Sequence, residues 1–317
     1  MNSRADVRLI TQIARLYYEE RLTQIEIAGQ LGMSQVSVCR FLKKAEDYNI
    51  VRTTVISPAG EFLDLEELLE RKFGLQQVLI AEASRDSEEQ VLTAIGAAAA
   101  HFLQTTVKSG EVIGISPWSA SLLSMVEHMH PVWKIQNCKV VQMLGGFDSP
   151  PAEKHANHLT TGLATLVQGE AHFLPTPGIV GSASSVKLLA NNPYVRETME
   201  LFDRMTLALV GIGSAEPSAL VASSGDAYST QELETIREKG GVGNICLRFY
   251  DSRGMSIQEP LGDRVIGMDL ERLRNVSRSV GIAGGEQNFP AILGALRGGW
   301  INIVITDQYT AKRLAMD

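Results

Sequence analysis

From residue 75 to the C-terminus, short runs of apolar residues alternate with longer amphipathic stretches. Near-continuous apolar runs such as residues 301–305 are typical of strands buried on both faces of a parallel sheet, with helices covering those faces. The alternation therefore predicts an α/β domain with a doubly wound, mainly parallel sheet. The expected strands cover residues 76–82, 111–115, 138–144, 171–174, 205–211, 244–250, 278–283 and 301–306.

The first fifty residues have a different pattern, that of three helices with very short connections. The sequence Thr23-Gln-Ile-Glu26 is a capping box that begins the second helix, and Gly32 ends that helix. Ser34 is the expected N-cap of the third helix, and the apolar residues that follow recur at helical spacing on one face. The unit from Thr23 to Asn49 therefore predicts a helix-turn-helix.

The domain boundary is expected near Pro58, which breaks a predicted short strand over residues 50–56 in the position of a wing. Residues 1–57 are then a winged helix-turn-helix domain, and residues 58–317 are an effector-binding and oligomerisation domain. An amphipathic linker helix over residues 61–74 begins the second domain and stops at Gly74.

The charge of the chain is unevenly distributed. The formal net charge of −7 over 317 residues by itself argues against nucleic acid as a partner. Residues 1–52, however, carry eight Lys and Arg against six Asp and Glu, a net of +2, so the remainder has a net of −9. This asymmetry fits a small DNA-facing module joined to a larger domain that does not contact DNA.

The composition argues against a membrane protein, a secreted protein and a metal-binding protein. No apolar run is long enough to span a membrane and no basic-then-apolar leader is present, so we expect a cytoplasmic protein that binds no membrane. The cysteines Cys39, Cys138 and Cys246 lie far apart without a Cys-x-x-Cys pair. We expect them to be reduced packing residues, and we expect no metal and no cofactor.

The outward face of the third predicted helix carries side chains that hydrogen-bond base edges and phosphates, as do its flanks. Gln35, Val36 and Arg40 are the expected base-reading residues. Further DNA contacts are expected from Thr23, Gln24, Ser34, Ser37, Lys43 and Lys44. The alternative is a solvated helical hairpin with ordinary surface charge.

Residues 22–55 resemble the winged helix-turn-helix of SorC-type sugar-responsive bacterial transcription regulators. The resemblance continues through matching segments of the second domain, at residues 114–122, 144–146, 209–213, 241–245, 280–285 and 291–307. It implies an effector domain similar to the sugar-phosphate isomerase and deaminase fold. The implied partners are operator DNA and a small sugar, polyol or sugar-phosphate effector, bound by a homo-oligomer, either a dimer or a tetramer.

The residues support a ligand site independently, because small ligands of open α/β sheets lie beyond the carboxyl ends of the strands. Hydroxyl, amide, aromatic and glycine residues follow several predicted strands there, ahead of a helix near Ala120 whose first amides could hold an anion. The candidate ligand-binding residues are Ser116, Trp118, Ser119, Ser121, Gly145, Gly146, Phe147, His155, Asn244, Glu286 and Asn288.

The chain also departs from the family's pattern. SorC-type regulators commonly carry an acid where this chain has Asn244 and a lysine where it has Asn288, and Ser223 stands where an arginine can occur. These differences favour an uncharged sugar or polyol, or a phosphate held by backbone amides. Arg248 and Lys187 are candidates to compensate for the missing cation.

Other chemistry is conceivable at two places. His155 and His158 with Glu153 could bind a metal, although hydrogen-bonded or exposed histidines are the preferred interpretation. Asp307 and Glu286 could form an acid–base pair, although a helix N-cap role for Asp307 is preferred.

Two alternatives to a DNA-binding regulator stay open. One is an enzyme of the sugar isomerase or deaminase type with an N-terminal helical appendage, and the other is an assembly module that uses the N-terminal helices for protein contacts. Because Asn244 and Asn288 cannot supply acid–base chemistry at neutral pH, we expect a regulator without a catalytic step.

Overall fold

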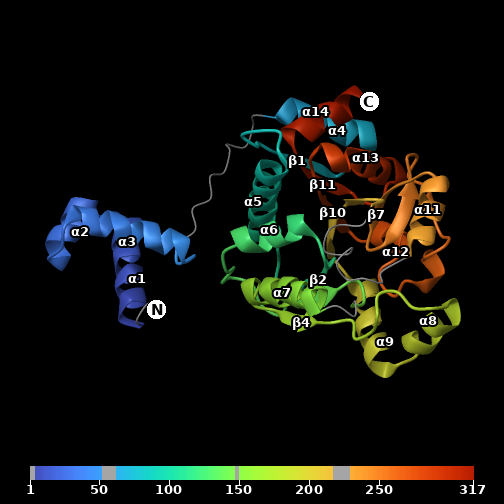
Figure 1. Ribbon diagram of the computed structural model, residues 1–317, viewed down its shortest axis with the longest axis horizontal. Helices are drawn as coiled ribbons and strands as arrows, with labels where there is room; N and C mark the ends of the chain where they lie inside the picture. The colour runs from blue at the N-terminus through green and yellow to red at the C-terminus, as the bar shows by residue number, and fades with distance from the viewer. Residues whose placement is uncertain (1–3, 52–61, 147–149, 217–228) are drawn as a thin grey trace. The chain divides into compact units, whose positions relative to one another are not determined.

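The computed structural model describes residues 4–51, 62–146, 150–216 and 229–317 (Figure 1). The chain divides into two compact units, Met1–Val55 and Ile56–Asp317. Pro58 and most of the strand predicted over residues 50–56 lie outside the described residues.

The first unit is the predicted three-helix arrangement, with α1 at Arg4–Tyr18, α2 at Gln24–Leu31 and α3 at Gln35–Asp47. The capping box is confirmed, because the Thr23 hydroxyl accepts from the Glu26 N–H and the Glu26 carboxylate accepts from the Thr23 N–H. Gly32 ends α2 in the left-handed conformation, at φ 63°. Ser34 caps α3 by accepting from the Ser37 N–H, at 3.2 Å. Local capping signals therefore fix the turn between the two helices.

The second unit is built on a seven-stranded sheet in the order β1-β11-β10-β5-β2-β3-β4, in which every pair of neighbours is parallel. The strands are β1 (Gln77–Ala81), β2 (Val112–Ile115), β3 (Lys139–Gln142), β4 (Glu170–His172), β5 (Leu207–Gly211), β10 (Arg278–Ile282) and β11 (Ile303–Asp307). They confirm the predicted strands except the one over residues 244–250. Parallel pairing places all their carboxyl ends at one edge, which we call the carboxyl edge.

Helices cover both faces of this sheet, as the sequence predicts. Side chains alternate along each strand, so that Ile113 packs into one apolar cluster and Val112 into another. One cluster lies against α5 (Glu88–Thr106), α6 (Ala120–His128) and α7 (Pro150–Leu166). The other lies against α4 (Leu63–Phe73), α13 (Phe289–Gly298) and α14 (Gln308–Met316). The sheet is therefore doubly wound and buried on both faces.

Shorter helices occupy the connections. They are α8 (Ala183–Ala190), α9 (Pro193–Glu200), α11 (Thr230–Glu238) and α12 (Leu270–Arg274), with single 3-10 turns at Phe202–Arg204, Gly262–Arg264 and Glu286–Asn288. Within the part of the chain that the structure describes, no helix has both the length and the apolar character needed to cross a membrane.

The prediction of one strand over residues 244–250 is wrong. That stretch contributes to a small antiparallel sheet, β6-β7-β8-β9, in which β7 and β8 form a hairpin. Cys246 and Leu247 make the tight turn, with φ of 50° and 59°. Both residues are buried, and neither is one of the Asn, Asp or Gly residues that normally form such a turn. The strands are β6 (Gly213–Ser214), β7 (Gly241–Ile245), β8 (Arg248–Asp251) and β9 (Ser256–Ile257).

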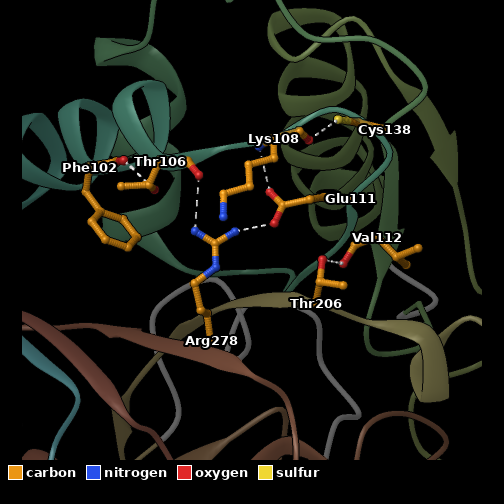
Figure 2. Close-up of polar contacts among 8 residues, drawn as sticks. All are labelled: Phe102, Thr106, Lys108, Glu111, Val112, Cys138, Thr206 and Arg278. Atoms are coloured by element: carbon orange, nitrogen blue, oxygen red, sulfur yellow. Dashed lines mark hydrogen bonds and ion pairs between the residues drawn. The ribbon is translucent and has the colours of Figure 1, made fainter.

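A polar cluster lies at the edge of the large sheet opposite the carboxyl edge, where β2 and β10 begin (Figure 2). The buried Glu111 accepts a hydrogen bond from the Lys108 N–H at 2.9 Å and pairs with Arg278. The Arg278 guanidinium also donates to the Thr106 carbonyl at the end of α5, at 3.3 Å. Polar side chains at this edge are therefore occupied with one another.

The predicted linker helix is present as α4, and its carboxylates cover the edge strand of the sheet. Glu66 accepts a hydrogen bond from the Ile80 N–H at 2.8 Å, and Glu70 accepts one from the Val78 N–H at 2.9 Å. These N–H groups belong to β1, whose other side pairs with β11. Burial raises the pKa of Glu66, and the nearby charge of Glu70 adds to this effect. Two side chains therefore act in place of a further strand.

We expect Glu66→Ala to lower the free energy of unfolding by about 1 to 3 kcal/mol, because it leaves the N–H of the buried Ile80 without its acceptor. Glu66→Gln keeps an acceptor oxygen in place and should cost less. Urea unfolding followed by circular dichroism measures both. Equal losses in the two variants would show that the hydrogen bond to β1 is not what stabilises the edge.

Candidate functional site

The third helix exposes the side chains that the sequence assigns to DNA recognition. Gln35, Arg40 and Lys43 are exposed on α3, and Val36 is 79% exposed. The apolar face of the same helix is buried against α1 and α2 through Val38 and Leu42. The helix therefore presents a polar and basic surface while its other face builds the core.

Several neighbouring residues are engaged within the unit. Thr23 and Ser34 serve as helix caps, and the Ser34 and Ser37 hydroxyls lie 2.9 Å apart. The Lys44 ammonium lies over the Phe41 ring, at 5.8 Å from its centre. Gln24 is half-buried at the start of α2.

The expectation that all three cysteines are packing residues is wrong for Cys39. Cys138 and Cys246 are buried, but Cys39 is exposed on α3 because it follows the inward-facing Val38. Burial raises the pKa of the Cys246 thiol to about 12, which keeps it protonated at neutral pH.

A cavity of about 610 Å³ opens at the carboxyl edge of the large sheet. Its wall includes residues that directly follow three strands: Ser116 after β2, Ile212 after β5 and Ala283 after β10. Strands β3 and β4 lie on one side of β2, whereas β5, β10, β11 and β1 lie on the other side. The cavity therefore lies where the strand order reverses, the usual ligand position of open α/β sheets.

One wall of the cavity is made of serine hydroxyls. Ser116 accepts a hydrogen bond from the Gly211 N–H at 3.1 Å, and Ser119 caps α6 through the Leu122 N–H at 3.3 Å. Ser121 donates to the Ile282 carbonyl at 2.7 Å. A Cβ at Gly211 would lie 2.3 Å from the Ser119 hydroxyl, so only glycine fits there. These hydroxyls are held in fixed positions by the ends of three strands.

Three non-glycine residues of the wall have left-handed backbones. Trp118 has φ of 59°, and the turn residues Cys246 and Leu247 have φ of 50° and 59°. All three are buried. Left-handed backbones on bulky residues are uncommon and cluster at functional sites.

Two asparagine amides line another part of the cavity. The Asn244 amide donates to the Ser214 carbonyl at 2.8 Å, and the Asn288 amide donates to the Gly284 carbonyl at 3.1 Å. These bonds fix the orientation of both side chains, and no hydrogen bond within the described residues engages their carbonyl oxygens. The two amides can therefore accept hydrogen bonds from ligand hydroxyls.

The cavity wall is acidic. Its described wall contains Asp86, Glu88, Glu216 and Glu286 but no Lys, Arg or His. Asp86 pairs with Arg313 at 2.7 Å and Glu216 with Arg237 at 2.5 Å. No ion pair within the described residues engages Glu88 or Glu286. The uncovered charge of the wall is therefore negative.

Some predicted ligand residues lie outside this wall. Gly145 and Gly146 donate to the carbonyls of Ile266 and Thr176, at 3.0 and 2.8 Å, rather than lining the cavity. A Cβ at Gly145 would lie 2.5 Å from the Thr176 carbonyl oxygen, so this glycine permits close contact between two loops. Phe147 lies outside the described residues.

His155 lies behind the cavity wall on α7, close to the Ser119 backbone. Burial lowers its pKa, and the neighbouring His158 lowers it further, so the neutral ring is favoured. Its Nε2 atom is buried, and it has no hydrogen-bond partner among the residues that the structure describes. Among the described residues, no group of three His, Cys, Asp or Glu side chains is arranged to hold a metal.

The suggested compensating cations do not reach the cavity. Arg248 is directed to backbone carbonyls, including those of Val265 at 3.1 Å and Met268 at 3.4 Å. Its pKa is lowered by burial. Lys187 is exposed on α8 and is not part of the wall, and Ser223 lies outside the described residues. The suggestion for Arg248 failed because the carbonyls it binds come from a later loop.

Asp307 is the N-cap of α14, as the preferred interpretation predicts. The Asp307 carboxylate accepts from the N–H groups of Tyr309 and Thr310 and from that of Gly285, at 2.9, 2.9 and 3.0 Å. It is fully buried and engaged, so it does not pair with Glu286 for acid–base work.

Sequence reasoning included Glu286 but missed the other three carboxylates of the wall, Asp86, Glu88 and Glu216. Asp86, Ser87 and Glu88 follow β1, and a polar segment after the first predicted strand was the available signal. Glu216 gave no such signal, because it enters the wall only through the small antiparallel sheet.

Comparison with known proteins identifies the family of the chain. Residues 57–315 match the family described as "Putative sugar-binding domain". The chain is 31% identical to the "Sorbitol operon regulator" of Klebsiella pneumoniae over 316 residues, 99% of each chain. It is 29% identical to the "Deoxyribonucleoside regulator" of Bacillus subtilis over 310 residues, 98% of each chain.

Solved structures agree. The full-length sorbitol operon regulator SorC from Klebsiella pneumoniae matches with a TM-score of 0.75 and 31% identity, over 99% of this chain and 100% of that one. A sugar-binding domain of a transcriptional regulator from Pseudomonas syringae matches with a TM-score of 0.64 and 37% identity, over 80% of this chain and 99% of that one. The chain belongs to the SorC family of transcriptional regulators with a sugar-binding domain.

Proposed function

We propose that this regulator binds operator DNA through α3 and that an uncharged sugar or polyol in the carboxyl-edge cavity changes its operator affinity. Residues 1–57 are assigned to DNA binding and residues 58–317 to effector binding and oligomerisation. The regulator function follows from the family, whose relatives are named "Sorbitol operon regulator" and "Deoxyribonucleoside regulator".

The charge of the cavity wall carries the proposal about the effector. A phosphate ester brings about two negative charges at neutral pH, and the described wall offers it no cationic side chain. The undescribed stretches 147–149 and 217–228 contain no Lys, Arg or His in their sequences. Serine hydroxyls and asparagine amides suit ligand hydroxyls, which both donate and accept. An effector without phosphate therefore fits this wall best.

No catalytic step is proposed at this site. The Asp307 carboxylate is engaged by backbone N–H groups, and Asn244 and Asn288 do not exchange protons at neutral pH. An enzyme of the isomerase type would need a base, and Glu88 and Glu286 are the wall carboxylates that no ion pair engages within the described residues. Recovery of a bound sugar unchanged after prolonged incubation, checked by NMR, distinguishes the regulator from that alternative.

Replacing Gln35 or Arg40 by Ala should weaken binding to a selected operator by about 1 to 3 kcal/mol, because each exposed side chain can reach a base edge. Binding to random DNA should change much less. Mobility-shift assays at two salt concentrations, using an operator obtained by selection from random sequences, measure both.

Arg71→Ala is the matched control for charge, since Arg71 is an exposed arginine on α4 in the other unit. It should leave the preference for operator over random DNA unchanged. If the Gln35 and Arg40 variants keep the same preference as the Arg71 control, these residues do not read bases.

Asn288→Lys should raise the affinity for a phosphorylated ligand by about tenfold or more relative to its uncharged form, because it adds a cation to the cavity wall. D-Sorbitol and its 6-phosphate are the first pair to compare by calorimetry, within a thermal-shift screen of sugars, polyols and their phosphates. A true effector at about 100 times its Kd stabilises the native state by about 2.7 kcal/mol.

Asn288→Gln keeps a neutral amide and should not produce this gain. The natural protein should bind the uncharged member of the pair more tightly. If only the phosphate ester binds the natural protein, and Asn288→Lys leaves its affinity unchanged, the uncharged-effector proposal is wrong.

A further inference from the structure

The last helix of the chain contacts the cavity wall through its first turn. The Gly285 N–H, in the wall, donates to the Asp307 carboxylate at 3.0 Å and to the Thr310 hydroxyl at 2.9 Å. The Thr310 hydroxyl donates to the same carboxylate at 2.6 Å. Asp307 and Thr310 are both fully buried. The position of this wall segment is therefore fixed by the beginning of α14.

A second segment of the wall is held by the same helix. The Gln308 amide accepts from the Ala83 N–H at 2.7 Å and donates to the Ala83 carbonyl at 2.6 Å. Three residues later, Asp86 lines the cavity and pairs with Arg313 at 2.7 Å. The Asp86 and Arg313 side chains are each about one-third exposed, so the pair is only partly buried. Helix α14 thus connects two separate parts of the wall.

The other end of α14 is bound to the linker helix. The Lys72 ammonium of α4 donates to the carbonyls of Leu314 and Ala315, at 3.0 and 3.3 Å. The buried Leu69 and Leu314 belong to the same apolar cluster. Figure 1 shows the two helices beside each other, next to the C-terminus. Arg313 directly precedes the first of these carbonyls, so the Asp86 pair and the Lys72 contact share one helical turn.

We propose that α14 couples the cavity to the linker helix, with Arg313 and Lys72 as positioning residues. This inference rests on the proposed function, because it concerns how an effector in that cavity acts on the rest of the chain. A ligand hydroxyl that donates to Asp86 competes with Arg313 for the carboxylate. The last turn of α14 then loses one of its fixed contacts, and the carbonyls that hold Lys72 lose their fixed position.

Hydrogen exchange of the full-length chain, without ligand or DNA, tests this coupling directly. Asp86→Asn removes the charge that holds Arg313 and should speed exchange of the α4 amides by about two- to fivefold. Glu88→Gln is the matched control, because Glu88 lines the same cavity and no hydrogen bond or ion pair within the described residues joins it to α14. It should leave exchange in α4 unchanged. Urea unfolding midpoints confirm that neither variant changes global stability enough to explain the difference.

Lys72→Met tests the second contact, because it keeps the aliphatic stem and removes the donor. It should also speed exchange in α4, and Asp86→Asn should then add nothing further to the double variant. Lys312→Met, at an exposed position of α14, is the control and should leave α4 exchange unchanged. If the two losses were independent, their effects on the α4 exchange rate would instead multiply in the double variant.

Equal exchange in the Asp86→Asn and Glu88→Gln variants would overturn the proposal, as would full additivity of Asp86→Asn and Lys72→Met. Neither measurement uses an effector or an operator. Failure of this coupling is therefore distinguishable from failure of the proposed function, which the ligand screen and the mobility-shift assays address.

Discussion

The parallel direction of all seven strands in the large sheet is the constraint on which the second unit depends. Both faces are buried by helices, so polar groups that are to meet a ligand can only gather at an edge. The carboxyl ends coincide, and residues distant in the chain such as Ser116 and Asn288 come to line one cavity. The opposite edge is occupied by Glu111 and Arg278, which bind each other. The sheet thus has the cavity at its carboxyl edge and the Glu111–Arg278 pair at the opposite edge.

Much of this architecture was predictable because its signals are local. The Thr23–Glu26 capping box and the Ser34 cap act within four residues, and apolar runs mark the buried strands. The candidate site was predictable in part for the same reason. Seven predicted residues line the cavity: Ser116, Trp118, Ser119, Ser121, Asn244, Glu286 and Asn288. Apart from Asn244, which lies within β7, they follow strands or begin helices. Whether they bind the effector is a question for the experiments above.

The errors have the opposite origin, in contacts between distant segments. The turn at Cys246 and Leu247 adopts a left-handed backbone that neither residue favours, and burial within the cavity wall holds it there. Arg248 looked available for a ligand, but its partners are carbonyls of a loop that follows it in the chain. Gly145 is glycine because a Cβ there would collide with the Thr176 carbonyl of a neighbouring loop. No pattern within a short window of sequence contains these partners.

The carboxylates of Glu66 and Glu70 also bear on how copies of this chain can associate. An open edge strand is a template for another strand, and sheets of two copies can join through such an edge. Here the outward N–H groups of Val78 and Ile80 already have acceptors from the linker helix. A second copy could extend the sheet at β1 only by displacing both side chains and the helix that carries them. An oligomer of this regulator would therefore not continue the sheet through β1, and the sheet would end within each subunit at this strand.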